Sequence, residues 1–345
     1  MIPLLDKIVS KSVLKLRKDV KDKVDGQRVL ITGGAGFLGS WLCDSFVDSC
    51  KVVCYDNLAT GRLENIEHLK GNKNFEYRRV DVSTKNWNVK GKFDLILHLA
   101  SRPSPDDYQK HPVETLAVST NGVAGALELA RRNDARLLFA STSEVYGDAQ
   151  VVPTPETYWG NVNPLGLRSC YDEGKRVSEA MCMAYKRQYN TDIRIVRIFN
   201  TYGPRIRAAG AYGRALPRFI VQALENKPLT VYGDGKQTRS FCYVSDTISG
   251  MIKALLHKRA AGEVFNIGNP REITITDLAK TIIGLTRSKS KIVFRPPLPD
   301  DPKRRCPDIG KAEEVLGWSP SVDLEEGVRE TIIWFKNSDN SGGLK

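Results

Sequence analysis

The chain has 345 residues and a formal net charge of +12, and 41% of its residues are hydrophobic. The length suits one large α/β domain with a smaller one, and the ordinary apolar fraction excludes a wholly disordered chain. The basic residues are spread along the sequence without a nucleic-acid reader motif, and no apolar run approaches the ~20 residues that span a bilayer, so neither nucleic acid nor a transmembrane segment is expected.

Residues 1–26 form a basic N-terminal extension in which lysines and arginines alternate with apolar residues. Its uncharged stretches are too short for the core of a secretory signal. One interpretation is a basic amphipathic helix that lies on a membrane. We favour the other, a solvated or subunit-packing helix in front of the first domain.

Residues 27–204 contain short apolar runs that alternate with longer amphipathic segments. The runs lie at 28–32, 52–56, 75–80, 95–100, 137–142 and 193–199. This alternation predicts βαβ units around a parallel sheet that is buried on both faces. The expected fold is therefore α/β, a Rossmann-like doubly wound parallel sheet with its ligand crevice at the carboxyl ends of the strands.

A glycine-rich loop follows the first run and precedes an expected helix. Gly33 allows the tight turn, Gly36 lets the backbone approach a pyrophosphate, and Gly39 permits close packing of the helix on the strand. The helix N-terminus favours the negative charge of the phosphates. The loop therefore predicts a bound dinucleotide.

Two carboxylates follow the next two runs. Asp56 ends the second run, at the spacing where an acidic residue bonds the adenosine ribose and repels a 2′-phosphate, which favours NAD over NADP. Arg62 lies close by and offers a partner to a 2′-phosphate, so NADP stays open. Asp81, after the third run, is expected near the adenine edge.

Tyr171 and Lys175 are four residues apart on an expected helix, so both project from one face. A neighbouring ammonium stabilises a phenolate, whose pKa is ordinarily about 10, and makes the tyrosine a usable base. The fifth run ends in Ser-Thr-Ser-Glu at 141–144, which brings hydroxyls and a carboxylate to the same crevice. The combination predicts the oxidation of a substrate hydroxyl.

After residue 204 the pattern loosens into glycine-bearing turns, helices near 217–225, 247–256 and 276–285, and a short strand at 263–267. We interpret residues 205–335 as mainly a smaller C-terminal α/β substrate-binding domain that closes over the crevice, with later segments free to return to the first domain. Residues 336–345 are rich in Ser, Gly and Asn and are expected to be a flexible tail.

The seven cysteines are odd in number and scattered, without a C-x-x-C pair or a Cys/His cluster of metal-binding spacing. Neither a disulfide framework nor a metal site is expected. Reduced cysteines in apolar stretches favour a cytoplasmic location.

Four stretches resemble the extended short-chain dehydrogenase/reductase family: 33–39, 141–148, 171–176 and 198–205. Within that family, the chain is most similar to the UDP-glucuronate decarboxylases, also called UDP-xylose synthases. The runs that carry this similarity are YWG at 158–160, CYDEGKR at 170–176, IFNTYGPR at 198–205 and KRRCPDI at 303–309. The resemblance covers about residues 27–335.

This resemblance implies a mechanism. Tyr171 takes the proton of the sugar 4-hydroxyl while hydride passes from C4 to NAD⁺, Thr142 shares the hydrogen bond, and Lys175 lowers the tyrosine's pKa and holds the nicotinamide ribose. The 4-ketone turns the C6 carboxylate into a β-keto acid, which loses CO₂, and return of the hydride gives UDP-xylose and recycles NAD⁺. Glu144 is the implied acid/base near C5, and Arg305 the implied cation facing the carboxylate.

The resemblance also implies the binding residues and the assembly. A homodimer is expected through the helices at 112–132 and 171–189. Substrate contacts are implied for Tyr108, Ser143, Arg168, Asn200, Arg214, Arg239 and Arg305. Cofactor contacts are implied for Gly33, Gly36, Phe37, Leu38, Gly39, Asp56, Asn57, Asp81, Val82, Leu99, Ser101, Tyr171, Lys175 and Thr201.

Three other activities remain as alternatives. A nucleotide-sugar 4,6-dehydratase usually has adjacent Asp-Glu after the threonine, whereas this chain has Ser143 before Glu144, and a serine is a poor proton donor. A 4-epimerase needs no carboxyl near C5, so Glu144 and Arg305 would be superfluous there. A cofactor-binding module without turnover is disfavoured by the intact set of threonine, tyrosine and lysine.

Three departures from the family pattern put the sugar contacts in doubt. Ala117, Val118 and Ser119 stand where the family commonly has lysine, threonine and asparagine. The loop at 207–213 is about two residues longer than usual, which leaves the alignment of Arg214 approximate. Arg102 is atypical and is expected to place an extra cation beside the substrate.

Overall fold

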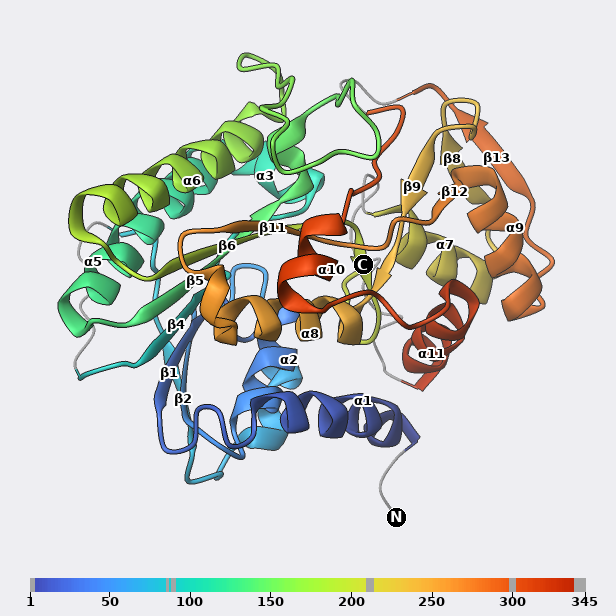
Figure 1. Cartoon of the computed structure of the whole chain (residues 1–345). Helices are drawn as coiled ribbons and strands as arrows, with labels where there is room; N and C mark the ends of the chain where they lie inside the picture. The colour runs from blue at the N-terminus through green and yellow to red at the C-terminus, as the bar shows by residue number, and fades with distance from the viewer. Residues whose placement is uncertain (1–3, 85–86, 88–90, 209–213, 298–301, 338–345) are drawn as a thin grey trace.

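The structure is a computed structural model that describes residues 4–84, 87, 91–208, 214–297 and 302–337 (Figure 1). Its centre is a seven-stranded sheet in the order β11-β6-β5-β4-β1-β2-β3, in which all neighbouring strands pair in parallel. The strands are β1 (Arg28–Thr32), β2 (Lys51–Asp56), β3 (Phe75–Arg79), β4 (Leu95–His98), β5 (Arg136–Thr142), β6 (Ile193–Ile198) and β11 (Val264–Ile267). The Rossmann-like sheet predicted from the sequence is confirmed.

Helices cover both faces of this sheet because successive apolar residues of each strand point to opposite sides. On one face, Val29 and Ile31 of β1 join a buried cluster with α2 (Phe37–Phe46) and α8 (Val244–Leu256). On the other face, Leu30 joins a cluster with α5 (Val123–Asn133) and α6 (Ser169–Tyr189). The near-continuous apolar strands of the sequence follow from this double covering.

The second lobe lies beside the carboxyl ends of the strands (Figure 1). It consists of α7 (Ala215–Leu224), α9 (Ile275–Thr286) and α11 (Leu324–Asn337) with two small sheets. One pairs β8 (Leu229–Tyr232) with β13 (Ile292–Arg295) in parallel, and the other pairs β9 (Thr238–Ser240) with β12 (Glu272–Thr274) in antiparallel fashion.

The chain crosses between the lobes several times. A short parallel pair, β7 (Thr201–Tyr202) and β10 (Cys242–Tyr243), lies at the junction. The chain then returns to the first lobe, where α8 packs on the sheet and β11 pairs with β6. The strand predicted at 263–267 is one of the later segments that return to the first domain: it is the seventh strand of the main sheet, and its register with β6 buries Phe265 and Ile267.

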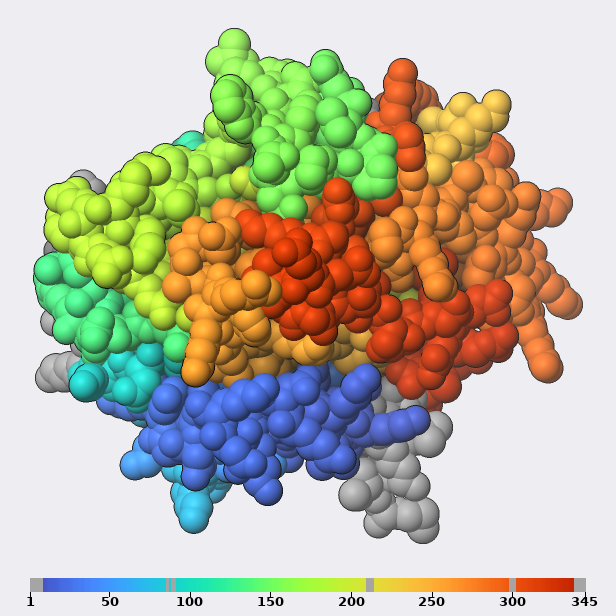
Figure 2. Space-filling model, in the orientation of Figure 1, coloured from blue at the N-terminus to red at the C-terminus, as the bar shows by residue number. Residues whose placement is uncertain are grey.

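The basic N-terminal segment contains α1 (Leu4–Val20), which runs across the outside of the first lobe (Figures 1 and 2). It packs against α2, α8 and α11, and it buries Val13, Leu16 and Val20. Arg17 donates to the backbone carbonyl of Asp44 and pairs with Asp48. The helix is thus packed on its own chain, an arrangement that neither of the two sequence interpretations included.

The remaining elements lie on the surface or at the ends of strands. They are α3 (Pro105–Lys110), α4 (Pro112–Ala117), the π-helical turn η3 (Val118–Gly122), α10 (Gly310–Leu316) and the 3-10 turns η1 (Leu63–Asn65), η2 (Glu67–Leu69), η4 (Ser143–Tyr146) and η5 (Lys258–Ala260). All seven cysteines are reduced and buried. None of the helices in the described part of the chain has the length and apolarity that crossing a membrane requires.

Candidate active site

A cleft of about 1200 Å³ lies at the carboxyl ends of the strands and extends to the second lobe. Its position follows from the strand order, because the chain leaves β1 toward β2 and β3 and then returns to β4 on the other side of β1. Ligands of doubly wound sheets bind at such a reversal. Loops after β1, β4 and β5 therefore line the cleft together with the start of α7.

In the glycine loop after β1, neighbouring backbone atoms lie too close to two of the glycines for any side chain. Gly33 has φ of +71°, and a Cβ there would lie 2.8 Å from the backbone nitrogen of Ala100. A Cβ on Gly39 would lie 2.1 Å from the carbonyl oxygen of Gly33, so only glycine lets α2 begin against the loop. A Cβ on Gly36 would meet only that same oxygen, at 3.1 Å, so this glycine faces open space at the N-terminus of α2.

Asp56, at the end of β2, is buried beside this loop. Its two carboxylate oxygens accept hydrogen bonds from the backbone N–H groups of Ala35, at 3.0 Å, and Leu58, at 2.8 Å. Burial raises the pKa of the carboxyl, although these two bonds oppose the shift. Each oxygen keeps a lone pair that a ribose hydroxyl can use.

The other proposed cofactor residues divide into two groups. Asn57, Asp81 and Val82 do not line the cleft as the structure describes it; Asp81 instead accepts hydrogen bonds from the backbone and hydroxyl of Ser83. The residues that do line it are Gly33, Gly36, Phe37, Leu38, Gly39, Asp56, Leu99, Ser101, Tyr171, Lys175 and Thr201.

Tyr171 and Lys175 both point from α6 into the cleft, beside Thr142 at the end of β5. Burial, together with the charge of Glu144, raises the pKa of Tyr171 to about 12, although a hydrogen bond with Thr142 opposes the shift. The ring of Tyr108 from α3 stacks on the Tyr171 ring, with centroids 5.3 Å apart and planes 7° apart.

The Lys175 ammonium is held by the sheet rather than by the tyrosine. Its Nζ donates to the carbonyl oxygen of Ala140 at 2.8 Å and lies 4.8 Å from the centre of the Phe139 ring. Burial lowers its pKa to about 8, while the charge of Glu179 raises it. The resemblance implied that Lys175 lowers the tyrosine's pKa; in this arrangement burial and Glu144 dominate that pKa and leave it high.

Glu144 lies between two arginines that are distant from it in the chain. Both nitrogens of the Arg305 fork donate to its carboxylate, at 2.8 and 2.9 Å, and Arg168 donates to the same carboxylate. Burial favours the neutral acid, but the charges of Arg305 and Arg168 outweigh it and lower the pKa of Glu144. The carboxylate is therefore ionised and fully paired.

Asp172 is a second carboxylate in this cluster, and the sequence analysis did not single it out. One of its oxygens lies 3.6 Å from Nε of Arg168, and the side chain is 7% exposed. Burial raises its pKa to about 7, and the charge of Glu144 adds to the shift. Two neighbouring carboxyls whose pKa values are pushed apart are typical of acid/base sites. The position of Asp172 directly after Tyr171 was the one signal in the sequence.

The remaining substrate candidates also line the cleft: Tyr108, Ser143, Asn200, Arg214 and Arg239. Asn200 donates to the carbonyl of Ser240 at 3.2 Å, and Arg239 is buried and donates to the carbonyl of Thr238 at 2.8 Å. These bonds orient both side chains at the edge of the second lobe.

The departures from the family pattern fall mostly outside the cleft. Ala117, Val118 and Ser119 are not among its lining residues, and the backbone carbonyl of Ser119 accepts a hydrogen bond from the Ser178 hydroxyl of α6. Arg102 is not itself among the lining residues, but its guanidinium pairs at 2.8 Å with Asp107, which lines the cleft, so an extra cation beside the substrate stays a prediction. Residues 209–213 lie outside the described residues; Arg207 donates to the carbonyl of Thr60 at 3.1 Å.

Comparisons with known proteins agree with this geometry. A family model described as GDP-mannose 4,6 dehydratase matches residues 30–331. The chain is 50% identical to UDP-glucuronic acid decarboxylase 1 of Danio rerio over 312 residues, 90% of this chain and 73% of the relative. It is 49% identical to UDP-glucuronic acid decarboxylase 3 of Arabidopsis thaliana, over 87% of this chain and 86% of the relative.

Solved structures of similar fold include several epimerases. The epimerase Mth375 of Methanothermobacter thermautotrophicus superposes with a TM-score of 0.84 at 28% identity, covering 95% of this chain and 96% of that one. The UDP-glucuronic acid 4-epimerase of Bacillus cereus, solved with UDP-glucuronic acid and NAD, has a TM-score of 0.79 at 31% identity, with 90% and 99% covered.

Proposed function

Because the chain belongs to the extended short-chain dehydrogenase/reductase family, we propose that it is an NAD-dependent carboxy-lyase that converts UDP-glucuronate to UDP-xylose. Two relatives at 49–50% identity are named UDP-glucuronic acid decarboxylases. The observation that carries the proposal is the Glu144–Arg305 pair near Tyr171, since decarboxylation needs a cation for the C6 carboxylate and a group that passes a proton to C5.

NAD is the proposed cofactor, and the residues fit it. The open space at Gly36 and the start of α2 suit a pyrophosphate, and the spare lone pairs of Asp56 suit an adenosine ribose. The same carboxylate disfavours a 2′-phosphate. When bound, NAD⁺ supplies the hydride acceptor for C4 and returns the hydride at the end of the cycle.

Tyr171 is the proposed base for the 4-hydroxyl, with Thr142 sharing the hydrogen bond to the same oxygen. Its raised pKa favours the phenol, so proton abstraction depends on positive charge that arrives with the reactants and on the Lys175 ammonium. Lys175 also lies where it can bind the nicotinamide ribose, because it lines the cleft from the same face of α6.

The two arginines and Glu144 handle the carboxylate. The carboxylate of UDP-glucuronate binds Arg305 and displaces Glu144 from it. Arg168 stays paired with Glu144. With a ketone at C4, the C5–C6 bond breaks, its electron pair moves toward the ketone oxygen, and CO₂ leaves. C5 then takes a proton, which we propose passes through Glu144; because this carboxylate is ionised in the free protein, it must first take that proton up from solvent. Each turnover thus consumes one proton from solvent.

Recognition of the UDP portion is assigned to Arg214, Arg239 and Asn200, because a diphosphate requires several donors. Tyr108 and Ser143 complete the sugar site. The second lobe thus supplies most of the nucleotide contacts and the first lobe the chemistry.

A homodimer through α4, α5 and α6 is proposed for the assembly. Val113, Leu116 and Val177 on α4 and α6 are 73%, 41% and 39% exposed, which gives these helices an apolar outer face. The reduced cysteines favour a reducing compartment, and we propose the cytoplasm as the location.

The experiment is incubation of the protein with UDP-glucuronate and NAD⁺, followed by mass spectrometry of the product. Loss of the mass of CO₂ supports decarboxylation. An unchanged mass with an altered sugar identifies a 4-epimerase, the activity of several solved neighbours. Loss of water from a UDP-hexose identifies a 4,6-dehydratase. Absence of turnover with every UDP-sugar leaves only a cofactor-binding module.

A further inference from the structure

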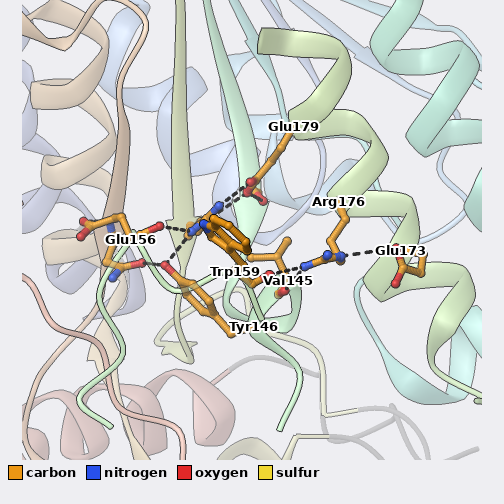
Figure 3. A network of polar contacts seen from close by, with 10 residues as sticks. Val145, Tyr146, Glu156, Trp159, Glu173, Arg176 and Glu179 are labelled. Carbon is orange, nitrogen blue, oxygen red and sulfur yellow. Dashed lines mark hydrogen bonds and ion pairs between the residues drawn. The ribbon is translucent and has the colours of Figure 1, made fainter. Parts of the chain in front are cut away.

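A buried ion pair lies behind the candidate active site. Arg197 of β6 donates through two nitrogens to the Glu179 carboxylate of α6, at 2.6 and 2.9 Å, and the two side chains are 13% and 12% exposed. Figure 3 shows Glu179 reaching from its helix toward Tyr146 and Glu156. Among the described residues, neither member of the pair lines the cleft.

On one side, this pair holds the catalytic strand and helix. Ser141, directly before Thr142, donates its hydroxyl to Glu179 at 2.5 Å. Glu179 follows Lys175 by one helical turn, and its negative charge favours the ammonium form of that buried lysine. The Glu179 carboxylate therefore bonds to the end of β5 and also influences the charge of Lys175 on α6.

On the other side, the pair reaches the segment that carries Arg305. Arg197 donates to the hydroxyl of Tyr146 at 2.9 Å, and that hydroxyl donates to Oδ1 of Asn266 at 2.7 Å. The Asn266 amide donates to the carbonyls of Thr154 and Asp308, both at 2.9 Å. Residue 308 lies three positions after Arg305, so a continuous line of bonds joins α6 to the Arg305 segment.

A second contact fixes the turn that carries Glu144. Arg176, one residue after Lys175, donates to the carbonyls of Val145 at 3.0 Å and Trp159 at 2.6 Å, as Figure 3 shows. The η4 turn is thus held at Val145 from one side and at Tyr146 from the other.

We infer that this network, formed by Ser141, Tyr146, Glu179, Arg197 and Asn266, is the positioning device of the site: it fixes the Glu144 turn against the Arg305 segment and holds the Glu179 carboxylate one helical turn from Lys175. The inference rests on the proposed function for the step that it controls. A fully paired buried network specifies one arrangement, because breaking any member leaves a buried polar group without a partner. Small displacements of reacting groups are costly to catalysis.

Tyr146→Phe tests the link between the two halves, because it removes one hydroxyl and keeps the ring. The matched control is Tyr158→Phe, whose ring lies 6.3 Å from that of Tyr146 and whose hydroxyl accepts only a 3.3 Å bond from the backbone of Gln150 among the contacts described. In Tyr146→Phe we expect C4 oxidation to persist and the decarboxylation rate to fall roughly tenfold or more. Reduced nicotinamide should then accumulate during turnover, with KM little changed.

Two outcomes overturn this link: identical kinetics in the two variants, or a parallel loss of oxidation and decarboxylation together with a lowered Tm, which marks a merely structural role. Reduced nicotinamide that accumulates only in Tyr146→Phe supports it.

Glu179→Gln tests the other half and remains informative if Tyr146→Phe does not fold. The single amide oxygen of glutamine can still accept from Ser141 and from Nε of Arg197, but the side chain has no charge and its nitrogen cannot accept the second Arg197 bond. The titratable groups around Lys175 are Glu179, Cys182 and Tyr171 on its own helix and His98 on β4, whose pKa burial lowers to about 3. Loss of the Glu179 charge lowers the pKa of Lys175, so the alkaline fall in C4 oxidation should begin at lower pH than in the wild type.

An unchanged alkaline limb in Glu179→Gln overturns the inference. This measurement follows oxidation at C4, which epimerases and dehydratases also perform, so it can be made with whichever UDP-sugar the wild type oxidises. If the wild type releases no CO₂, the proposed function is wrong, but the positioning role of the network can still be tested.

Discussion

Glu144 and Arg305 are 161 residues apart in the chain, yet the Arg305 fork donates to both oxygens of the Glu144 carboxylate. Arg168 donates to the same group from a third direction. The Glu144 carboxylate thus occupies the position at Arg305 that the C6 carboxylate of the proposed substrate would take. A sugar with a neutral C6 group has no negative charge that could replace Glu144 as the partner of Arg305. We therefore expect this pair to select for a uronate.

Replacing Arg305 should affect the acidic sugar selectively. Arg305→Met leaves Glu144 with one partner fewer in a buried site, and truncating one member of such a pair costs about 2–5 kcal/mol. We expect kcat/KM for UDP-glucuronate to fall by the corresponding factor, about 30-fold or more, while C4 oxidation of UDP-glucose changes far less. Arg304→Met, which loses only an exposed pair with Glu272, is the control. Equal losses with both sugars would contradict the assignment.

Tyr171→Phe should abolish the 4-keto intermediate without unfolding the protein. The phenyl ring still stacks on Tyr108, so the packing is retained while the proton acceptor is lost. The measurement is the absorbance of reduced nicotinamide after addition of UDP-glucuronate, with Tm recorded in parallel. Tyr185→Phe, on the same helix but outside the cleft lining, should behave like the wild type. Normal turnover of Tyr171→Phe would defeat the proposed mechanism.

Glu144→Gln should separate oxidation from the later steps. The amide cannot carry a proton to or from C5, and it removes the counter-charge of Arg305, while Arg168 keeps its pair with Asp172. C4 oxidation should continue, and product analysis by mass spectrometry should show little completed UDP-xylose and an accumulated oxidised intermediate. A rate of UDP-xylose formation equal to that of the wild type would remove Glu144 from the mechanism.

Activity should fall at alkaline pH because Lys175 loses its proton at a lower pH than an ordinary lysine. Its pKa is lowered to about 8 from the usual 10.5 by burial, so the ammonium is present below that pH and lost above it. Since the phenolate and the cofactor ribose both depend on the charged form, kcat/KM should decline as the pH rises through about 8. A profile that stays flat up to the ordinary lysine range, ~10.4, would show that this charge is not required.

Gly39→Ala should weaken NAD binding. A Cβ there lies 2.1 Å from the Gly33 carbonyl oxygen, so α2 must move away from the loop. About 1.4 kcal/mol of distortion already gives a tenfold weaker Kd, which titration calorimetry can measure. Gly284→Ala is the control, because a Cβ there meets no atom within 4 Å and alanine favours the α9 helix by up to ~1 kcal/mol. The same NAD affinity in both variants would show that the loop does not hold the pyrophosphate.

The local parts of the fold were predictable because their signals are local. The glycine loop, the six expected strands and the helix bearing Tyr171 follow from short patterns of apolar residues and glycines. The strand at 264–267 is predictable as a strand, but its place in the main sheet is not, because its partner β6 lies about 70 residues earlier and its own sequence does not indicate which strand it pairs with.

The polar interior was not predictable in the same way. Glu179 and Arg197 look like ordinary surface charges on a helix and a strand, and only tertiary pairing removes both from water. Asp172 has the same ambiguity, since its environment is created by Glu144 and Arg168. Sequence patterns identify the residues that act on the substrate more readily than those that hold them.

Because the chain returns to the first lobe, neither lobe is one continuous segment that could be exchanged alone. The helix α8 and the strand β11 complete the first lobe between the early elements of the second lobe (α7, β8 and β9) and its later ones (β12, α9, β13 and α11), and α1 contacts α11 near the other end of the described chain. During synthesis, the cofactor sheet lacks its edge strand until more than three quarters of the chain has been made. The two lobes are therefore not interchangeable cassettes, and a swap of nucleotide specificity between relatives has to exchange several interleaved segments at once.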